Sequence, residues 1–307
     1  MIEIGDEKMI FEETFKKNNK QISYIRYGEW AKKIILFFHD FTGSKRFIPE
    51  KEISSGICIL SFDRPGIGKS DIEEYYKMES FLNHINSVLA DKNIESVHLI
   101  GHSAGGYYAQ LYAELYPSKI KSLSLLSSMI PLNSPNTQKI LNMQWKIIKF
   151  MTLHAKRFSK FYFRKMAEDI IKNYDQQFER NLKNISEKER CFMCENFVLI
   201  KNAIINSTAN NGLGMYYDAY ALSQMRECPQ QKNAFPVFIW NGTDDNTTPI
   251  SFAQYLNKQY NTTKLHIIEN MGHMLYLPCW DKILEEILTL YIKRLFIVIY
   301  FPFPYNH

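Results

Sequence analysis

A serine between two glycines stands where an apolar strand pattern ends and a helical pattern begins. The strand is predicted at residues 96–102, and residues 101–105 then read G-H-S-A-G, a G-x-S-x-G motif. A sharp strand-to-helix turn needs small residues two positions before and after its apex, because a Cβ there would collide with the neighbouring backbone. Such a turn also leaves the N–H of Ala104 unpaired at a helix N-terminus, where it can donate to a negative charge. The chain is therefore predicted to hold Ser103 on a tight turn between strand and helix.

Apolar strand patterns recur along most of the chain and alternate with helical patterns. They fall near residues 9–16, 21–27, 33–39, 57–63, 96–102, 121–127, 236–242 and 264–269. Alternation of this kind predicts the α/β class, with a mostly parallel eight-stranded sheet and helices on both of its faces. The first two strands are joined across Lys17 to Lys20, so they are expected to form an antiparallel hairpin at the edge of the sheet.

Two later turns carry the groups that a reactive serine requires. A serine hydroxyl is a poor nucleophile at its free pKa, so a histidine must take its proton and a carboxylate must orient that histidine. The strand at 236–242 runs into a turn with Asp244 and Asp245, and the strand at 264–269 runs into a Gly-His turn at His273. The order serine, aspartate, histidine differs from the orders in chymotrypsin and subtilisin, and it is the order of the α/β hydrolases.

Taken together, these motifs resemble the α/β-hydrolase-fold serine hydrolases of the carboxylesterase and lipase type, and the likeness covers nearly all of the chain outside a central insert. Residues 34–44 resemble the family's strand and His-Gly-x oxyanion loop, and residues 61–71 read S-F-D-R-P-G-I-G-K-S-D, which matches the family's D-x-P-G-x-G-x-S loop. The resemblance implies that Ser103, Asp245 and His273 form a catalytic triad.

The resemblance also implies how the rest of the site is built. The backbone N–H groups of Phe41 and Ala104 are expected to form the oxyanion hole. This chain has Asp40 where the family usually has glycine, so its side chain is expected either to narrow the loop or to place a carboxylate near the oxyanion. The substrate pocket is expected to be lined by residues that flank these motifs, namely His39, Asp40, Thr42, His102 and Met274.

The acidic residues of these loops have separate expected roles. The family pattern G-x-x-D-x-x-x-P selects Asp245 as the acid of the triad and leaves Asp244 as a turn or capping residue. Asp63, Arg64 and Asp71 are expected to fix the loop that contains them, because charge pairs and Asx turns commonly fix such loops.

The strand pattern stops where the α/β hydrolases carry a cap. We therefore expect an α/β-hydrolase core at residues 1–129 and 233–307, and a helical cap at 130–232 that roofs the pocket. The first long helix of the cap is predicted at 145–165.

This helix is basic and amphipathic. One of its faces is mostly apolar, because Ile147, Met151, His154, Phe158 and Phe161 follow helical spacing along it. Such a helix can hold an anionic substrate or lie on a membrane surface, or it can be a solvated outer face over a packed inner face. Its basic residues, with no acid among them, are Lys146, Lys149, Lys156, Arg157, Lys160, Arg164 and Lys165.

An apolar run, residues 295–301, is expected to follow the last core helix and is closed by Pro302 and Pro304. It is shorter than the roughly 20 residues that span a bilayer, yet burying apolar surface stabilises by ~25 cal/mol per Å². The tail 295–303 is therefore expected to pack on its own domain or against a second subunit of a homodimer, with no role in the chemistry.

Two short motifs resemble cofactor-binding sequences, but each lacks a glycine that the complete motif requires. Gly68-Lys69-Ser70 matches the end of a phosphate-binding loop, but the complete motif requires glycine at position 63, where this chain has Asp63. A dinucleotide fingerprint that begins at Gly66 needs glycine at position 71, which is Asp71. No cofactor is implied.

Composition and net charge limit the classes of protein to which the chain can belong. The chain has 307 residues, 46% hydrophobic and 22% charged, which is ordinary for one large globular core. A net charge of +5 without RNA-binding or zinc-finger motifs predicts no nucleic-acid partner.

Cys191 and Cys194, the one close pair of five cysteines, are expected to pack in a helix rather than bind metal. Unpaired thiols, early acids without a secretory signal and the lack of a spanning segment predict a cytoplasmic protein.

The resulting hypothesis is a cofactor-free serine hydrolase, monomeric or homodimeric, that cleaves a small-molecule carboxylic ester through an acyl-enzyme. The same triad would serve a thioesterase, a lactonase, an amidase or an acyltransferase. A protein of this fold can also keep the triad and act as a ligand-binding receptor with little turnover, because a fold alone does not decide function.

Overall fold

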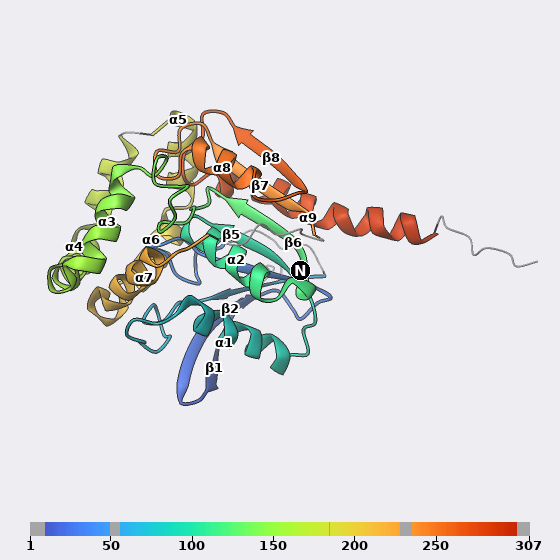
Figure 1. Ribbon diagram of the computed structural model, residues 1–307, viewed down its shortest axis with the longest axis horizontal. Helices are drawn as coiled ribbons and strands as arrows, with labels where there is room; N and C mark the ends of the chain where they lie inside the picture. The colour runs from blue at the N-terminus through green and yellow to red at the C-terminus, as the bar shows by residue number, and fades with distance from the viewer. Residues whose placement is uncertain (1–9, 50–55, 184, 228–234, 300–307) are drawn as a thin grey trace, which may run out of the picture.

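Eight strands form one sheet with the order β1-β2-β4-β3-β5-β6-β7-β8 (Figure 1). The computed structural model describes residues 10–49, 56–183, 185–227 and 235–299. Only β1 with β2 and β2 with β4 pair antiparallel, whereas the other five pairs are parallel. The predicted sheet and its edge hairpin are confirmed. The strands are β1 (Ile10–Lys17), β2 (Lys20–Tyr27), β3 (Lys33–Phe38), β4 (Ile57–Phe62), β5 (Val97–His102), β6 (Ile120–Leu126), β7 (Val237–Gly242) and β8 (Thr263–Ile268).

Helices cover both faces of the sheet. Neighbouring residues of a strand point to opposite faces. The ring of Phe37 in β3 lies 5.8 Å from the ring of Trp280, whereas the ring of the next residue, Phe38, lies 6.2 Å from Tyr112. Trp280 belongs to α9 and Tyr112 to α2, so these two helices lie on opposite faces. The helices of the core, outside the insert between β6 and β7, are α1 (Met78–Asp91), α2 (Ala104–Leu115), η1 (Pro117–Lys119), α8 (Ile250–Asn257) and α9 (Tyr276–Ile299).

The end of α9 differs from the sequence-based prediction. The helix continues to Ile299, so residues 295–299 of the apolar run are part of the last helix instead of following it. The periodicity of a short, uniformly apolar run does not distinguish a helix from a separate segment. The side chains of this run and residues 300–303 lie outside the described residues, so the packing of the tail stays a prediction.

A helical insert separates β6 from β7, and its described residues contain no strand. They fall within the predicted cap, whose exact limits at residues 130 and 232 stay a prediction. The helices α3 and α4 lie at the outer edge of the molecule (Figure 1), where both contact α7. The helices of the insert are α3 (Met143–His154), α4 (Lys156–Leu182), α5 (Glu187–Glu195), α6 (Phe197–Ser207), η2 (Ala209–Gly212) and α7 (Leu213–Ser223).

The single helix predicted at 145–165 is two helices. They are separated by Ala155, whose φ of −118° and ψ of 50° are not helical. Neither glycine nor proline marks this break in the sequence, which explains why the pattern did not reveal it. The break lets α3 pack along α7 while α4 turns to contact both α7 and η2.

A buried ion pair connects the insert to the core. Arg64 Nη2 lies 2.9 Å from Asp218 Oδ2, and both side chains are almost fully buried. The hydroxyls of Tyr76 and Tyr108 donate to Asp218 Oδ1 at 2.8 and 2.7 Å. The same guanidinium donates to the carbonyl oxygens of residues 39–41. Asp218 of α7 is therefore joined through Arg64 to the loop that follows β3.

We predict that Asp218→Ala lowers the free energy of unfolding by about 3–5 kcal/mol, because it leaves a buried guanidinium without its carboxylate. Urea denaturation, monitored by tryptophan fluorescence, measures this loss of stability. The control is Asp175→Ala, which removes a more exposed pair with Lys201 at 2.7 Å and should cost at most about 1 kcal/mol. Equal losses in the two variants would show that the buried pair has no special role.

Candidate active site

Ser103 occupies the tight turn that the sequence predicts between strand and helix. Its φ of 54° and ψ of −120° are strained for a residue with a side chain. A Cβ at Gly101 would lie 2.5 Å from the carbonyl oxygen of Gly105, and one at Gly105 would lie 2.0 Å from the carbonyl oxygen of Phe38. Both glycines are therefore required by the close approach of backbone on either side of the turn.

Asp245 and His273 form a hydrogen-bonded pair at the ends of β7 and β8. Nδ1 of His273 lies 2.9 Å from Asp245 Oδ2. The N–H groups of Thr247 and Thr248 donate to Asp245 Oδ1 at 2.9 and 2.8 Å, and the Thr248 hydroxyl donates to Oδ2 at 2.7 Å. Burial alone would raise the pKa of Asp245, but His273 and these donors lower it to about 2. Asp244, by contrast, is exposed and accepts a hydrogen bond from the hydroxyl of Thr243.

His102 links the serine turn to the histidine loop. Its Nε2 lies 2.9 Å from the carbonyl oxygen of His273, and the two rings are 4.9 Å apart. Burial lowers the pKa of His102 to about 3, so the ring is neutral and its Nε2–H donates this bond. The bond brings the residue before Ser103 against His273. His102 exposes no surface, and its expected place in the substrate pocket stays a prediction.

The loop after β3 lies under the insert. The ring of Phe41 is 6.1 Å from Trp145 of α3 and 6.0 Å from Phe163 of α4. None of the described residues accepts a hydrogen bond from the N–H of Phe41 or of Ala104. Thr42 is half-buried in this loop, as Met274 is in the histidine loop, whereas His39 is fully buried. Burial and the nearby Arg64 hold the pKa of His39 well below its usual range.

Asp40 places a carboxylate in the same loop. Its Oδ1 is buried and has no hydrogen-bond partner among the described residues. It lies over the position where a Cβ of Gly43 would be, 2.1 Å away, so the loop has room for this side chain only because residue 43 is glycine. Burial raises the pKa of Asp40 to about 6, against the opposing charges of His273 and Arg64.

The insert also supports the histidine loop. Glu189 of α5 is buried, and its Oε1 accepts from the N–H of Met274 at 3.4 Å. Ser186 at the start of α5 donates its hydroxyl to the carbonyl oxygen of Asn270 at 2.9 Å and caps the helix by accepting from Glu189 N. The Ser-x-x-Glu spacing is visible in the sequence as a helix start. Nothing in the sequence indicates that this glutamate turns toward His273, so its place in the site is new.

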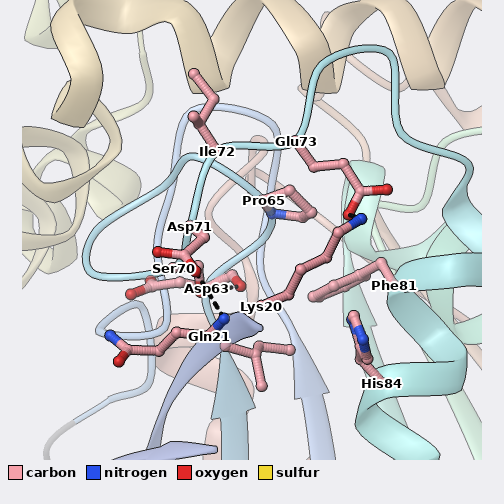
Figure 2. Close-up of a pocket in the computed structure, with 11 residues that line it drawn as sticks. Lys20, Gln21, Asp63, Pro65, Ser70, Asp71, Ile72, Glu73, Phe81 and His84 are labelled. Carbon is pink, nitrogen blue, oxygen red and sulfur yellow. Dashed lines mark hydrogen bonds and ion pairs between the residues drawn. The ribbon is translucent and has the colours of Figure 1, made fainter. Parts of the chain in front are cut away.

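The loop at residues 61–71 is fixed by charges, as predicted. Asp63 Oδ2 lies 2.5 Å from the buried ammonium of Lys45, and Asp71 Oδ2 accepts from the N–H of Gln21 at 2.8 Å. Figure 2 shows these acids gathered beside the start of β2, around a hollow of only about 20 Å³. None of the predicted triad residues lines this hollow, so the loop supports the site without forming its pocket.

Within the described ranges, no cluster of three or more His, Cys, Asp or Glu side chains is placed to bind a metal ion. No helix in that part of the chain is both long enough and apolar enough to cross a bilayer.

Comparison with known proteins agrees with this fold. A family model described as alpha/beta hydrolase fold matches residues 33–278. The uncharacterized hydrolase YcgS of Bacillus subtilis is 24% identical over 240 residues, which cover 73% of this chain and 78% of YcgS. Epoxide hydrolase 4 of Mus musculus is 27% identical over 163 residues, but these cover only 48% of this chain and 43% of the mouse protein.

Among solved structures, the esterase EaEST from Exiguobacterium antarcticum superposes with a TM-score of 0.67 at 19% identity. The match covers 89% of this chain and 96% of the esterase, so it extends over the sheet and the insert alike. At this identity the likeness concerns the fold alone. Because the family model spans most of the chain, from β3 into α9, the protein belongs to the alpha/beta hydrolase fold family.

Proposed function

We propose that the protein is a serine hydrolase that cleaves a carboxylic ester, with Ser103 as nucleophile, His273 as general base and Asp245 as the acid that orients it. The observation that carries the proposal is the Asp245–His273 hydrogen bond of 2.9 Å beside the strained turn of Ser103. A buried, ionised carboxylate on Nδ1 fixes the tautomer that leaves Nε2 free to accept a proton.

The reaction follows from these positions. Ser103 Oγ forms a bond to the ester carbonyl carbon while its proton passes to His273 Nε2. The N–H groups of Phe41 and Ala104 stabilise the oxyanion of the tetrahedral intermediate. The C–O bond to the alcohol then breaks, and His273 returns the proton to the leaving oxygen. A water molecule, deprotonated by His273, forms a bond to the acyl carbon. The bond from this carbon to Ser103 Oγ then breaks, His273 returns the proton to Oγ, and the carboxylic acid is released.

Serine at position 103 separates this proposal from epoxide hydrolysis. Epoxide hydrolases of this fold use an aspartate at the nucleophile position, and a serine cannot replace its carboxylate in opening an epoxide. The partial likeness to Epoxide hydrolase 4 therefore supports the fold and not that chemistry. Thioesters, lactones and amides would use the same triad and are distinguished by substrate assays.

The charge around His273 sets the expected pH dependence. Burial alone would lower the pKa of His273, but the carboxylate of Asp245, with smaller contributions from Asp40 and Glu189, raises it above its ordinary value. A general base must be neutral to accept a proton, so kcat/KM is expected to rise as the pH increases through this pKa.

We predict that Ser103→Ala folds normally and loses ester turnover by a factor on the order of 10⁴–10⁶, because no other group can form the acyl-enzyme. The assay is hydrolysis of short-chain p-nitrophenyl esters, with circular dichroism to verify folding. Ser87→Ala, a serine of α1, is the control and should keep full activity. Turnover retained in Ser103→Ala would contradict the mechanism, and a wild-type protein that binds esters without turnover would indicate a receptor.

We predict that Asp245→Asn lowers kcat by about 10⁴, because an asparagine favours the wrong tautomer of the histidine. The neighbouring Asp244→Asn is a matched control, since it is the same chemical change one residue away at an exposed position, and it should cost little. Steady-state kinetics on the same ester compares the two. Losses of equal size, or a larger loss in Asp244→Asn, would show that the acid is misassigned.

We predict that Asp40→Asn moves the acidic limb of the pH profile of kcat/KM to lower pH. With a pKa of about 6, Asp40 is mostly ionised where His273 titrates, and its negative charge stabilises the imidazolium. Removing that charge lowers the pKa of His273, so the neutral base persists to lower pH. Asp244→Asn should leave the limb in place. A limb that does not move, or that moves to higher pH, would mean that Asp40 does not act on His273.

A further inference from the structure

Exposed apolar side chains are concentrated on the two outer helices of the insert. Among the described residues, eight large apolar side chains are more than half exposed, and all eight belong to the insert. Six of them fall within 20 consecutive residues of α3 and α4 and are named here the outer apolar surface. They are Met143, Ile147, Phe150, Phe158, Phe161 and Tyr162.

Helical spacing gathers these side chains into stripes. Met143, Ile147 and Phe150 follow i, i+4, i+7 spacing along α3, and the other three follow i, i+3, i+4 spacing at the start of α4. The opposite sides of the two helices carry the buried residues Trp145 and Phe163. Of the alternatives that the sequence leaves open, a packed apolar face under a solvated outer face is therefore wrong for Ile147, Phe158 and Phe161, which are more than half exposed. Periodicity reveals that a stripe exists but not which way it faces.

The sequence stretch that carries the outer apolar surface has charges of one sign only. From Met143 to Ala167 the chain has seven lysines and arginines and no acid. Arg157 and Arg164 are exposed, alternate with the apolar residues of α4, and form no salt bridge with any described residue. The surface thus combines exposed aromatic rings with unpaired cationic groups.

Three of the lysines of this basic stretch contact other parts of the protein. Lys160 donates to the Tyr217 hydroxyl at 3.0 Å, and Lys149 donates to the carbonyl oxygen of Leu132 at 2.9 Å. The ammonium of Lys156 lies 5.1 Å from the ring of Tyr75. These cations join the outer helices to the rest of the molecule, so the exposed arginines are the groups left to recognise an anionic partner.

We propose that the outer apolar surface docks on an anionic lipid surface, with its apolar side chains among the acyl chains and the arginines at the phosphate head groups. A helix with exposed aromatic and aliphatic residues beside basic ones is the type that binds at the boundary between head groups and acyl chains. Association with a second copy through the same face is opposed by the repulsion of two basic surfaces that contain no acid.

The position of this surface connects it to the site. The inner residues Trp145 and Phe163 of the same helices contact Phe41, which is proposed to supply an oxyanion N–H. Docking would therefore place the lipid directly outside the helices that roof the oxyanion loop. This proposal rests on the proposed hydrolase function and extends it: the substrate would be an acyl ester of a lipid.

The test is co-sedimentation of the full-length protein with phosphatidylcholine vesicles, prepared with and without phosphatidylglycerol. The wild-type protein should bind the anionic vesicles and should bind them less as salt is added. Phe158→Glu/Phe161→Glu should weaken binding on the order of tenfold or more, because charged groups replace the rings that would enter the acyl chains. Arg157→Gln/Arg164→Gln should weaken binding to anionic vesicles about fivefold for each lost charge.

The matched control is Ile171→Glu/Val198→Glu, which makes the same change at two equally exposed apolar positions of the insert outside the outer apolar surface. It should keep both vesicle binding and turnover of a soluble ester, and urea unfolding verifies that both glutamate variants fold. Because vesicle binding is measured without turnover, it succeeds or fails independently of the proposed hydrolase activity.

Three results would overturn the proposal. The first is wild-type protein that does not prefer anionic vesicles, and the second is equal binding by the two glutamate variants. The third is a wild-type dimer in sedimentation velocity that Phe158→Glu/Phe161→Glu dissociates, since a second copy would then cover the surface.

Discussion

The close contact between backbones at the Ser103 turn is the constraint on which the rest of the site depends. Strain in a positive-φ serine costs about 1–3 kcal/mol, and it persists only where surrounding structure over-determines it. Here the N–H of Ser103 donates to the carbonyl oxygen of Leu126, and its own carbonyl oxygen accepts from Met129, both at 2.9 Å. Because β5 lies between β3 and β6 near the centre of the sheet, the turn is held on both sides.

The insert does more than cover the site. It contacts the loop after β3 through Trp145 and Phe163, and the same loop is bonded to Arg64, whose carboxylate partner Asp218 lies on α7. It also contacts the histidine loop through Glu189 of α5. Two of the three loops that build the proposed site are therefore held partly by insert residues, so a change in the packing of the insert would alter the geometry of catalysis as well as access.

The sequence was sufficient for features that are encoded locally. The strands, the Ser103 turn and the difference between Asp244 and Asp245 follow from short patterns whose geometry allows few alternatives. Asp218 and Glu189 could not be found in this way, because each acquires its role by contacting a segment more than 80 residues away. The break at Ala155 and the outward direction of Phe158 and Phe161 likewise depend on which neighbours α3 and α4 pack against.

The proposed turnover proceeds through an acyl group on one serine, Ser103. The most direct test is rapid acid quenching of the wild-type enzyme during ester turnover, followed by mass spectrometry of the peptide that contains Ser103. This peptide should gain the mass of the acyl group of the ester, and the gain should disappear as substrate is exhausted. An acyl group on a different residue, or steady turnover without any acylated peptide, would contradict it.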